Sequence, residues 1–263
     1  MKVNSDVSGL IIAFNHKRFL GHAIESMIEQ SLQPREILVI VNKSQDNTLS
    51  VANAYKKLHK NLNVIDLNKN IGPSNSWNLG VKSSNSEYVA VSSGDDISLP
   101  TRLEFQKKIL ENSKKSIVAN LVQLIDKSGR LINGAWGGGE FFECSPAHLY
   151  DNLFWNQNFI NGSSVCVRKS EYSEMNPFYL QLHDFDSWLK VSRRSKILVS
   201  PEILVNYRVL DDSLSHKSEN GSTVDLERTN IELQQIYISS LLSLDDSKIG
   251  TLLKIYKLQL AQI

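Results

Sequence analysis

The first hundred residues of this 263-residue chain alternate between two hydrophobic periods, which limits the possible folds more than any other feature. Continuous apolar runs typical of buried strands occupy residues 7–14, 36–41, 62–67 and 88–92. The segments between them have apolar residues at helical spacing, which predicts helices over 19–30, from Asp46 or Thr48 to about 60, over 74–81 and over 100–110. Repeated strand–helix–strand units form right-handed crossovers and a parallel sheet. The sequence therefore predicts an α/β, Rossmann-like domain with a mostly parallel sheet and helices on both faces.

In such sheets, ligands bind at the carboxyl ends of the strands. The segments that follow the first, second and fourth predicted strands are 14–17, 42–44 and 93–96. We expect these three segments to face one ligand.

After residue 116 the pattern changes. We predict a hairpin over 117–132 with its turn at 126–129, a short strand over 163–167, a helix over 184–194 and a strand over 197–209. From residue 226, leucine and isoleucine recur at helical spacing and predict a C-terminal helical segment. That segment either packs on the core, forms a homodimer interface or lies on a membrane surface.

Composition excludes several classes of protein. The formal net charge is +1, which argues against broad nucleic-acid binding. No segment reaches the ~20 apolar residues of a membrane span. Cys144 and Cys166 are too few for a disulfide framework or a zinc cluster, so we expect buried reduced thiols. The expected location is the cytoplasm, with the inner face of the membrane as an alternative.

Two adjacent carboxylates, Asp95 and Asp96, follow the fourth predicted strand. Like charges this close destabilise each other unless a cation or strong donors neutralise them. Mn²⁺ or Mg²⁺ would do so, because hard divalent ions prefer oxygen ligands. In the alternative interpretation, one aspartate caps the next helix and the other is solvated.

Several segments in the first 110 residues resemble glycosyltransferase family 2 in order and spacing. They are the strand 7–14 with Asn15, the helix motif 19–30, the strand 36–39 with Ser44, Asp46 and Thr48, the motifs 70–72 and 78–80, and the strand end 87–90 with Asp95, Asp96 and Pro100. Downstream, residues 158–168, the acidic motif 183–190 and the pair Tyr207–Arg208 are similar to that family's second half.

The resemblance implies a GT-A fold. It divides the chain into a nucleotide-sugar-binding half (1–115), an acceptor-binding half (116–218) and a C-terminal helical segment (219–263). It also implies an inverting transfer of a sugar from a nucleoside-diphosphate donor to a glycan or lipid-linked acceptor in cell-surface polysaccharide synthesis, such as that of O-antigen or capsule.

The resemblance also implies roles for particular residues. Asp184 matches the family's base, although a carboxylate in the first turn of a helix can also simply complement the helix dipole. Asp95 and Asp96 match the metal-binding position. The donor-binding positions are Phe14, Asn15, Asn42, Asn70, Gly72, Asn78, Gly94 and Asp95.

The acceptor candidates are Trp136, His183 and Asp186, each with a structural alternative. Trp136 precedes three glycines and either stacks on a sugar or belongs to the core. His183 stands where the family usually has glutamate and either contacts the acceptor or faces solvent. Asp186 is otherwise a cap or structural partner.

Several residues depart from the family pattern. Among them, Ser93 replaces the first carboxylate of its acidic run, Asn42 replaces an aspartate, Trp77 replaces an arginine and Leu210 replaces a histidine. The oxygen of Asn42 suits the N3–H of uracil, so UDP is the first choice of nucleotide. In the alternative, Asn42 is a turn residue. The departures leave one rival function, a non-catalytic nucleotide-sugar-binding or scaffold protein.

Overall fold

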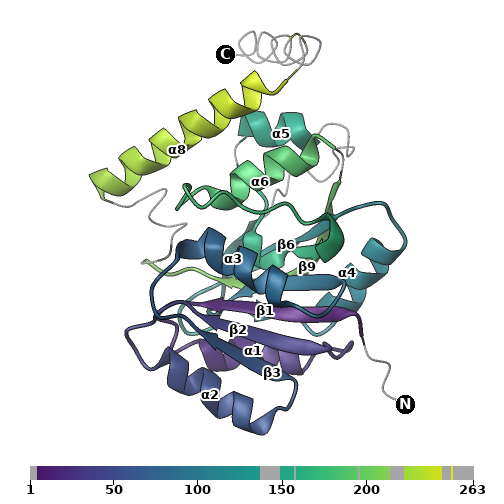
Figure 1. The fold of residues 1–263 in the computed structure, drawn as a ribbon, viewed down its shortest axis with the longest axis vertical. Coiled ribbons are helices and arrows are strands. Elements are labelled where there is room, and N and C mark those ends of the chain that lie inside the picture. The colour runs from purple at the N-terminus through teal and green to yellow at the C-terminus, as the bar shows by residue number, and fades with distance from the viewer. Residues whose placement is uncertain are drawn as a thin grey trace.

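A computed structural model describes residues 5–136, 149–156, 158–194, 196–211, 213, 222–244 and 250. Its first 111 residues contain every strand and helix that the hydrophobic periods predict there (Figure 1). These elements are β1 (Val7–Ala13), α1 (Leu20–Ile28), β2 (Glu36–Val41), α2 (Thr48–Leu58), β3 (Leu62–Asp66), α3 (Gly72–Ser83), β4 (Tyr88–Ser93) and α4 (Arg102–Glu111). The two-residue strand β5 (Ile97–Ser98) is too short to leave a periodic signal.

The sheet combines a parallel half and a mixed half. Strands β3, β2, β1 and β4 lie side by side in that order and are parallel. Beyond β4 follow β8 (Cys166–Arg168), β6 (Ile117–Ile125), β9 (Ile197–Arg208) and β5. Strand β8 is antiparallel to both β4 and β6, whereas β9 is parallel to β6. One sheet therefore runs through both halves of the sequence.

The predicted hairpin is confirmed. Strand β7 (Leu131–Trp136) pairs with β6 in antiparallel register, and Gly129 supplies the positive φ of 85° in the turn. The strand predicted over 163–167 begins instead at Cys166. Residues Gly162–Ser164 form a 3-10 turn, because the side chain of Asn161 accepts a hydrogen bond from the backbone N–H of Ser163 and caps that turn.

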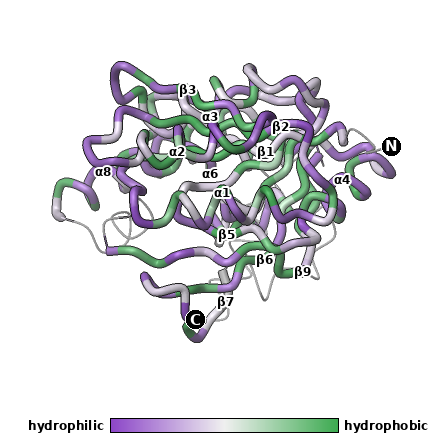
Figure 2. The backbone as a smooth tube through the Cα atoms, turned by 90° about the horizontal axis from the view of Figure 1, so that it is seen from below, coloured by the Kyte–Doolittle hydropathy of each residue, from purple (hydrophilic) through white to green (hydrophobic). Residues whose placement is uncertain are grey.

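Apolar side chains cover both faces of the sheet. Helices α1, α2 and α4 pack on one face through Ile24, Ala52 and Leu103. On the other face, Trp77 of α3 joins a cluster with residues of α5 (Leu149–Asn156) and α6 (His183–Ser192). Figure 2 shows hydrophobic stretches, coloured green, along the backbone of strands β1 and β6. Sequence reasoning did not predict α5, and α6 starts one residue before its predicted beginning.

The C-terminal helix α8 (Thr223–Leu242) lies beside α6 (Figure 1). Its residues Glu232, Ile236 and Ser240 recur every four positions and are buried. For α8, the interpretation that the C-terminal segment packs on the core is therefore correct. Within the described residues, we find no helix with the length and apolar character needed to cross a membrane.

At Gly80, helix α3 packs directly against a side chain of β1. A Cβ atom there would lie 2.4 Å from Cδ1 of Leu10, a side chain that is fully buried in the core. We expect Gly80→Ala to destabilise the protein by about 1–3 kcal/mol, the usual effect of overpacking a core. Urea denaturation followed by circular dichroism measures this change.

Gly21→Ala is the matched control, since Gly21 is also a helical glycine. Its added Cβ would lie 3.2 Å from Oη of Tyr55, a hydroxyl at the edge of the structure. Replacing glycine by alanine in a helix stabilises it by roughly 0.5–1 kcal/mol. This gain offsets the cost of a small shift of the Tyr55 hydroxyl, so we expect little change in the free energy of unfolding. Equal stability losses in the two variants would contradict the proposed close packing at Gly80.

Candidate functional site

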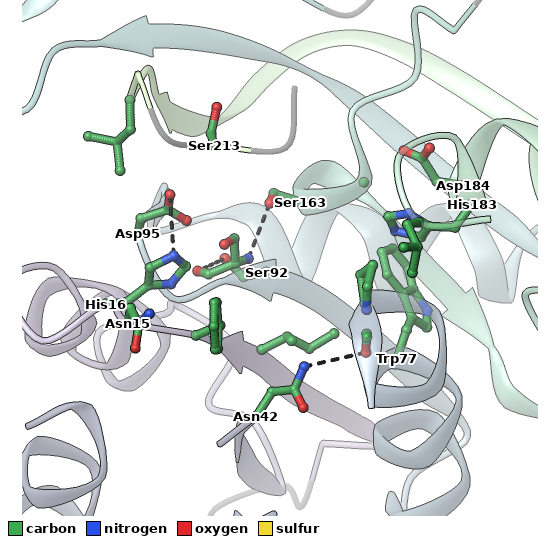
Figure 3. Close-up of a pocket in the computed structure, with 18 of the residues that line it drawn as sticks. Asn15, His16, Asn42, Trp77, Ser92, Asp95, Ser163, His183, Asp184 and Ser213 are labelled. Atoms are coloured by element: carbon green, nitrogen blue, oxygen red, sulfur yellow. Dashed lines mark hydrogen bonds and ion pairs between the residues drawn. The ribbon is translucent and has the colours of Figure 1, made fainter. Parts of the chain in front are cut away.

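A pocket of about 1410 Å³ opens at the carboxyl ends of β1, β2 and β4. Residues 14–17, Asn42, Ser93 and Asp95 line it, so the three strand ends that the sequence predicts to face one ligand do meet. Figure 3 shows Asp95 and His16 at one side of the pocket, and His183 and Asp184 at the other. The pocket is thus bounded by the first half of the chain and by the start of α6.

The turn after β1 is fixed by side-chain hydrogen bonds. Asn15 has a φ of 59°, a left-handed conformation that asparagine adopts more readily than most residues. Its backbone N–H donates to Oγ of Ser44 at 3.0 Å, and its Oδ1 accepts from the N–H of Gln45 at 2.8 Å. These bonds hold the 14–17 turn against the turn after β2, and Phe14 is left 41% exposed at the pocket.

Asp46 also stabilises the turn after β1 by accepting backbone hydrogen bonds. One oxygen of Asp46 accepts from the backbone N–H of Lys17 at 3.0 Å, and the other accepts from the N–H of Thr48 at 2.9 Å. Burial by itself would raise the pKa of Asp46, but the hydrogen bonds from Thr48 and Lys17 outweigh it and the pKa is lowered. Asp46 therefore stays ionised and holds the beginning of α2 against the β1 turn.

The side chain of Asn42 forms hydrogen bonds to the turn that begins α3. Its Nδ2 donates to Oδ1 of Asn70 at 2.9 Å, and its Oδ1 accepts from the N–H of Ile71 at 2.9 Å. Oδ1 of Asn70 also accepts from the N–H of Gly72, whose φ of +79° suits glycine. Asn42, Asn70 and Gly72 all line the pocket, and the side chain of Asn42 also forms the turn contacts that the sequence left open as an alternative.

Asp95 is the carboxylate that faces the pocket. It is 8% exposed, and its Oδ2 lies 3.8 Å from Nε2 of His16, which is too long for a hydrogen bond. Gly94 makes this approach possible, because a Cβ at residue 94 would lie 2.8 Å from Nδ1 of His16. Gly94 is not itself among the pocket-lining residues.

Asp96 points into the protein. It is fully buried and does not line the pocket, and its Oδ1 accepts from the backbone N–H of Arg208 at 2.8 Å. Burial and the neighbouring charge of Asp95 raise the pKa of Asp96 well above its usual value. Nε of Arg208 donates to the backbone carbonyl of Asp95 at 2.9 Å, so Arg208 holds both aspartates in place.

The pocket offers few side-chain ligands for a divalent ion. No three histidine, cysteine, aspartate or glutamate side chains lie together as a ready-made metal cage in the described part of the chain. Asp95 offers one carboxylate to the pocket with the imidazole of His16 beside it. This set fits an ion that takes its other ligands from phosphate oxygens and water, as Mg²⁺ usually does. Asp96 does not fit as a ligand from the pocket side.

Asp184 lies in the first turn of α6 and lines the opposite side of the pocket. Its Oδ1 accepts from Nδ2 of Asn158 at 3.0 Å and from the N–H of Phe185 at 2.8 Å. No described residue forms a hydrogen bond to its Oδ2, which lies 3.6 Å from the position of a Cβ on Gly162. One oxygen is therefore anchored, while the other is left for a ligand.

A buried polar network supports the pocket floor between these two sides. Arg102 is fully buried, and burial lowers its pKa to about 10. It donates to the backbone carbonyls of Val91 and Val165 at 2.6 and 3.2 Å. Next to it, Gln106 donates to the carbonyl of Ser164 at 2.7 Å. Through these bonds α4 fixes the 3-10 turn whose Gly162 and Ser163 line the pocket.

Besides Gly94 and Asp96, two further predicted site residues, Asn78 and Asp186, do not line the pocket. The amide of Asn78 bonds the backbone of Met175 and the hydroxyl of Tyr172, and its donor-binding role stays a prediction. Asp186 is 3% exposed and pairs with Lys190 at 2.6 Å, an arrangement that matches the structural-partner alternative. The side chain of Trp136 lies outside the described residues.

Trp77 and His183 do line the pocket. Trp77 is 5% exposed and packs edge-on against Trp188, with ring centroids 6.1 Å apart. The residue in place of the family's arginine is thus part of an apolar wall. His183 begins α6 beside Asp184.

Sequence reasoning left four residues at or near the pocket without a role. His16 lies inside the predicted 14–17 segment, so the strand-end rule already pointed to it. Arg208 was part of a motif, but only the path of β9 brings it to Asp95. Asp225 and Arg228 of α8 also line the pocket, and no motif marked them.

The comparisons with known proteins agree with this geometry. The family model described as glycosyl transferase family 2 matches residues 8–172, more than half of the chain. An uncharacterized glycosyltransferase of Haemophilus influenzae is 28% identical over 237 residues, covering 86% of this chain and 73% of the relative. The putative teichuronic acid biosynthesis glycosyltransferase TuaG of Bacillus subtilis is 20% identical, covering 80% of this chain and 81% of the relative.

Among solved structures, S. aureus TarS residues 1–349 in complex with UDP-GlcNAc superposes with a TM-score of 0.70. The sequence identity is 16%, and the match covers 94% of this chain and 70% of that one. The same protein in complex with UDP gives a TM-score of 0.67. The predicted GT-A fold is confirmed by this similarity. From the family match, we conclude that this chain belongs to glycosyltransferase family 2 and is a glycosyltransferase.

Proposed function

We propose that the chain transfers a sugar from a nucleoside-diphosphate donor to a hydroxyl group of a glycan or lipid-linked acceptor, with inversion at the anomeric carbon. The observation that carries this proposal is the placement of two carboxylates on opposite sides of one pocket (Figure 3). Asp95 lies beside His16 at the end of β4, and Asp184 lies at the start of α6. A single displacement needs a base for the acceptor hydroxyl on one side of the reacting carbon. On the other side it needs a group that stabilises the leaving diphosphate.

In this mechanism the acceptor oxygen attacks the anomeric carbon and forms the new glycosidic bond. The bond from that carbon to the diphosphate oxygen breaks, and the nucleoside diphosphate leaves with the electron pair. Oδ2 of Asp184 takes the proton of the acceptor hydroxyl, while Asn158 and the N–H of Phe185 hold its Oδ1. General-base catalysis of this kind contributes typically ~10²–10⁴ in rate.

The donor half (1–115) is proposed to hold the nucleotide diphosphate. Phe14, Asn15, Asn70 and Gly72 would contact the nucleotide end, and Asp95, with His16 beside it, would hold Mn²⁺ or Mg²⁺ against the phosphates. Such an ion, when bound, stabilises the negative charge that develops on the leaving group. UDP is the proposed nucleotide because TarS is described with UDP and UDP-GlcNAc.

The acceptor half (116–218) is proposed to bind the growing glycan. The similarity to TuaG supports cell-surface polysaccharide synthesis as the process. His183 lies beside the proposed base and is kept as an acceptor contact. The proposed location is the cytoplasm. Val224, Ile231, Ile238 and Leu242 are exposed on α8 at 64%, 56%, 58% and 83%, and attachment of α8 to a membrane face or to a second copy remains a proposal.

Thermal melting against UDP, dTDP, GDP and CMP, each with and without Mn²⁺, tests the donor proposal. A ligand at a hundred times its Kd stabilises the folded state by about 2.7 kcal/mol. We expect a rise in Tm with UDP that requires Mn²⁺. The UDP-sugars are then screened for release of UDP with and without candidate acceptors.

The rival function, a non-catalytic nucleotide-sugar binder, predicts a different pattern. Such a protein would show the metal-dependent rise in Tm but no release of UDP from any UDP-sugar. If none of the four nucleotides changes Tm, the donor proposal is wrong, because Asn42, Trp77 and Ser93 would then have removed the nucleotide site.

A further inference from the structure

A single carboxylate on α8 holds the segment of chain that leads into α6. Oε1 of Glu232 accepts a hydrogen bond from the backbone N–H of Leu180 at 2.9 Å. Oε2 accepts from the N–H groups of Gln181 and Leu182 at 3.0 and 2.9 Å. Three consecutive backbone donors therefore converge on one side chain from a different part of the sequence.

The environment of Glu232 suits it to accept these three backbone hydrogen bonds. It is 5% exposed, and no lysine or arginine of the described chain forms an ion pair with it. A buried charge is costly unless hydrogen bonds compensate it, and here the three N–H groups do so. Hydrogen bonds to an ionised acceptor are also roughly twice as strong as neutral ones. One turn earlier on α8, the hydroxyl of Thr229 adds a bond to the side chain of Gln181.

The segment that Glu232 holds is a wall of the pocket. Leu180, Gln181, His183 and Asp184 all line it. At its other end, the carbonyls of Asn176 and Tyr179 accept from the hydroxyl of Ser74 on α3 at 3.1 and 3.2 Å. The segment 176–182 is thus tied to the donor half on one side and to α8 on the other, directly before the turn that carries Asp184.

We propose that Glu232 is a positioning residue: it fixes Asp184 at its working place through the backbone of residues 180–182, which makes α8 a functional part of the active site. This inference rests on the proposed role of Asp184 as the base. Glu232 does not touch the pocket itself, so its effect on the reaction is indirect.

The test compares Glu232→Gln with Glu227→Gln, a variant with the same change of charge at an exposed position of the same helix. A glutamine keeps one acceptor oxygen and turns an NH₂ group toward the N–H donors. Amide hydrogen exchange is measured first, because it needs no substrate. We expect exchange at residues 180–182 to rise at least tenfold in Glu232→Gln and to stay within about twofold in Glu227→Gln. Unchanged exchange in Glu232→Gln would overturn the proposal.

The second measurement separates positioning from general stability. With the UDP-sugar that the wild-type protein turns over, we expect Glu232→Gln to lower kcat at least tenfold. Its Kd for UDP with Mn²⁺ should stay within about twofold, since the contacts of the donor half are intact. Loss of kcat and UDP affinity in equal measure would mean that Glu232 has only a structural role. If the wild-type protein turns over no UDP-sugar, the proposed function fails, while hydrogen exchange still decides whether Glu232 fixes the segment.

Discussion

Asp184→Asn is expected to lower kcat for sugar transfer by about 10²–10⁴, while the Kd for UDP stays within about twofold. Asparagine has the shape of aspartate and keeps an oxygen for Asn158 and the N–H of Phe185, so the start of α6 should keep its conformation. What it loses is the ability to take the acceptor proton on Oδ2. Steady-state kinetics with the donor selected by nucleotide screening, together with UDP titration, measure both quantities.

Asp186→Asn is the matched control, two residues away on the same helix. Asp186 is buried, pairs with Lys190 and does not line the pocket, so this variant should lose some stability and little kcat. A kcat for Asp184→Asn close to that of the wild type would mean that another group takes the acceptor proton. Asp184 would then be only a helix-capping carboxylate.

The second large effect is expected at Asp95. Asp95→Asn should abolish the Mn²⁺-dependent part of the rise in Tm with UDP, because an amide binds hard divalent ions much more weakly than a carboxylate does. Turnover should fall with it, since a bound metal supplies several kcal/mol of charge stabilisation in the transition state. The backbone carbonyl that accepts from Arg208 is unchanged, so the variant should fold.

Asp66→Asn provides the control for the change in charge, because Asp66 ends strand β3 of the same sheet, is exposed and lies outside the pocket. Its Tm should rise with UDP and Mn²⁺ as that of the wild type does. If Asp95→Asn retained the metal-dependent shift, the ion would have to be held elsewhere, and the pairing of Asp95 with His16 would have no part in donor binding.

The parallel half of the fold followed from the sequence, because each element there carries its own signal. Strand β2 has the predicted bounds, 36–41. All six of its residues are buried, five of them are apolar, and the carboxylate of Glu36 accepts a hydrogen bond from Ser8. The second half of the fold was harder to predict from the sequence. Helix α5 and strand β5 were missed, and β8 was displaced by a 3-10 turn that depends on the side chain of Asn161. Short elements held by side chains from distant segments leave no periodic pattern.

The sequence by itself determined which strand ends would meet, because parallel strands bring their carboxyl ends to one edge whatever packs around them. It thus brought residues 14–17, Asn42, Ser93 and Asp95 to one pocket. Only the tertiary structure decided which side chains remain free to act there. It turned Asp95 toward His16 and Asp96 toward Arg208, and it committed Asn42 to the turn at Ile71. It also brought Glu232 to residues 180–182, about fifty positions earlier in the chain. The physical reason is that the hydrogen-bonding capacity left to a polar group depends on its neighbours in space. Those neighbours come from distant segments, and the spacing of these segments in the sequence does not reveal the contact.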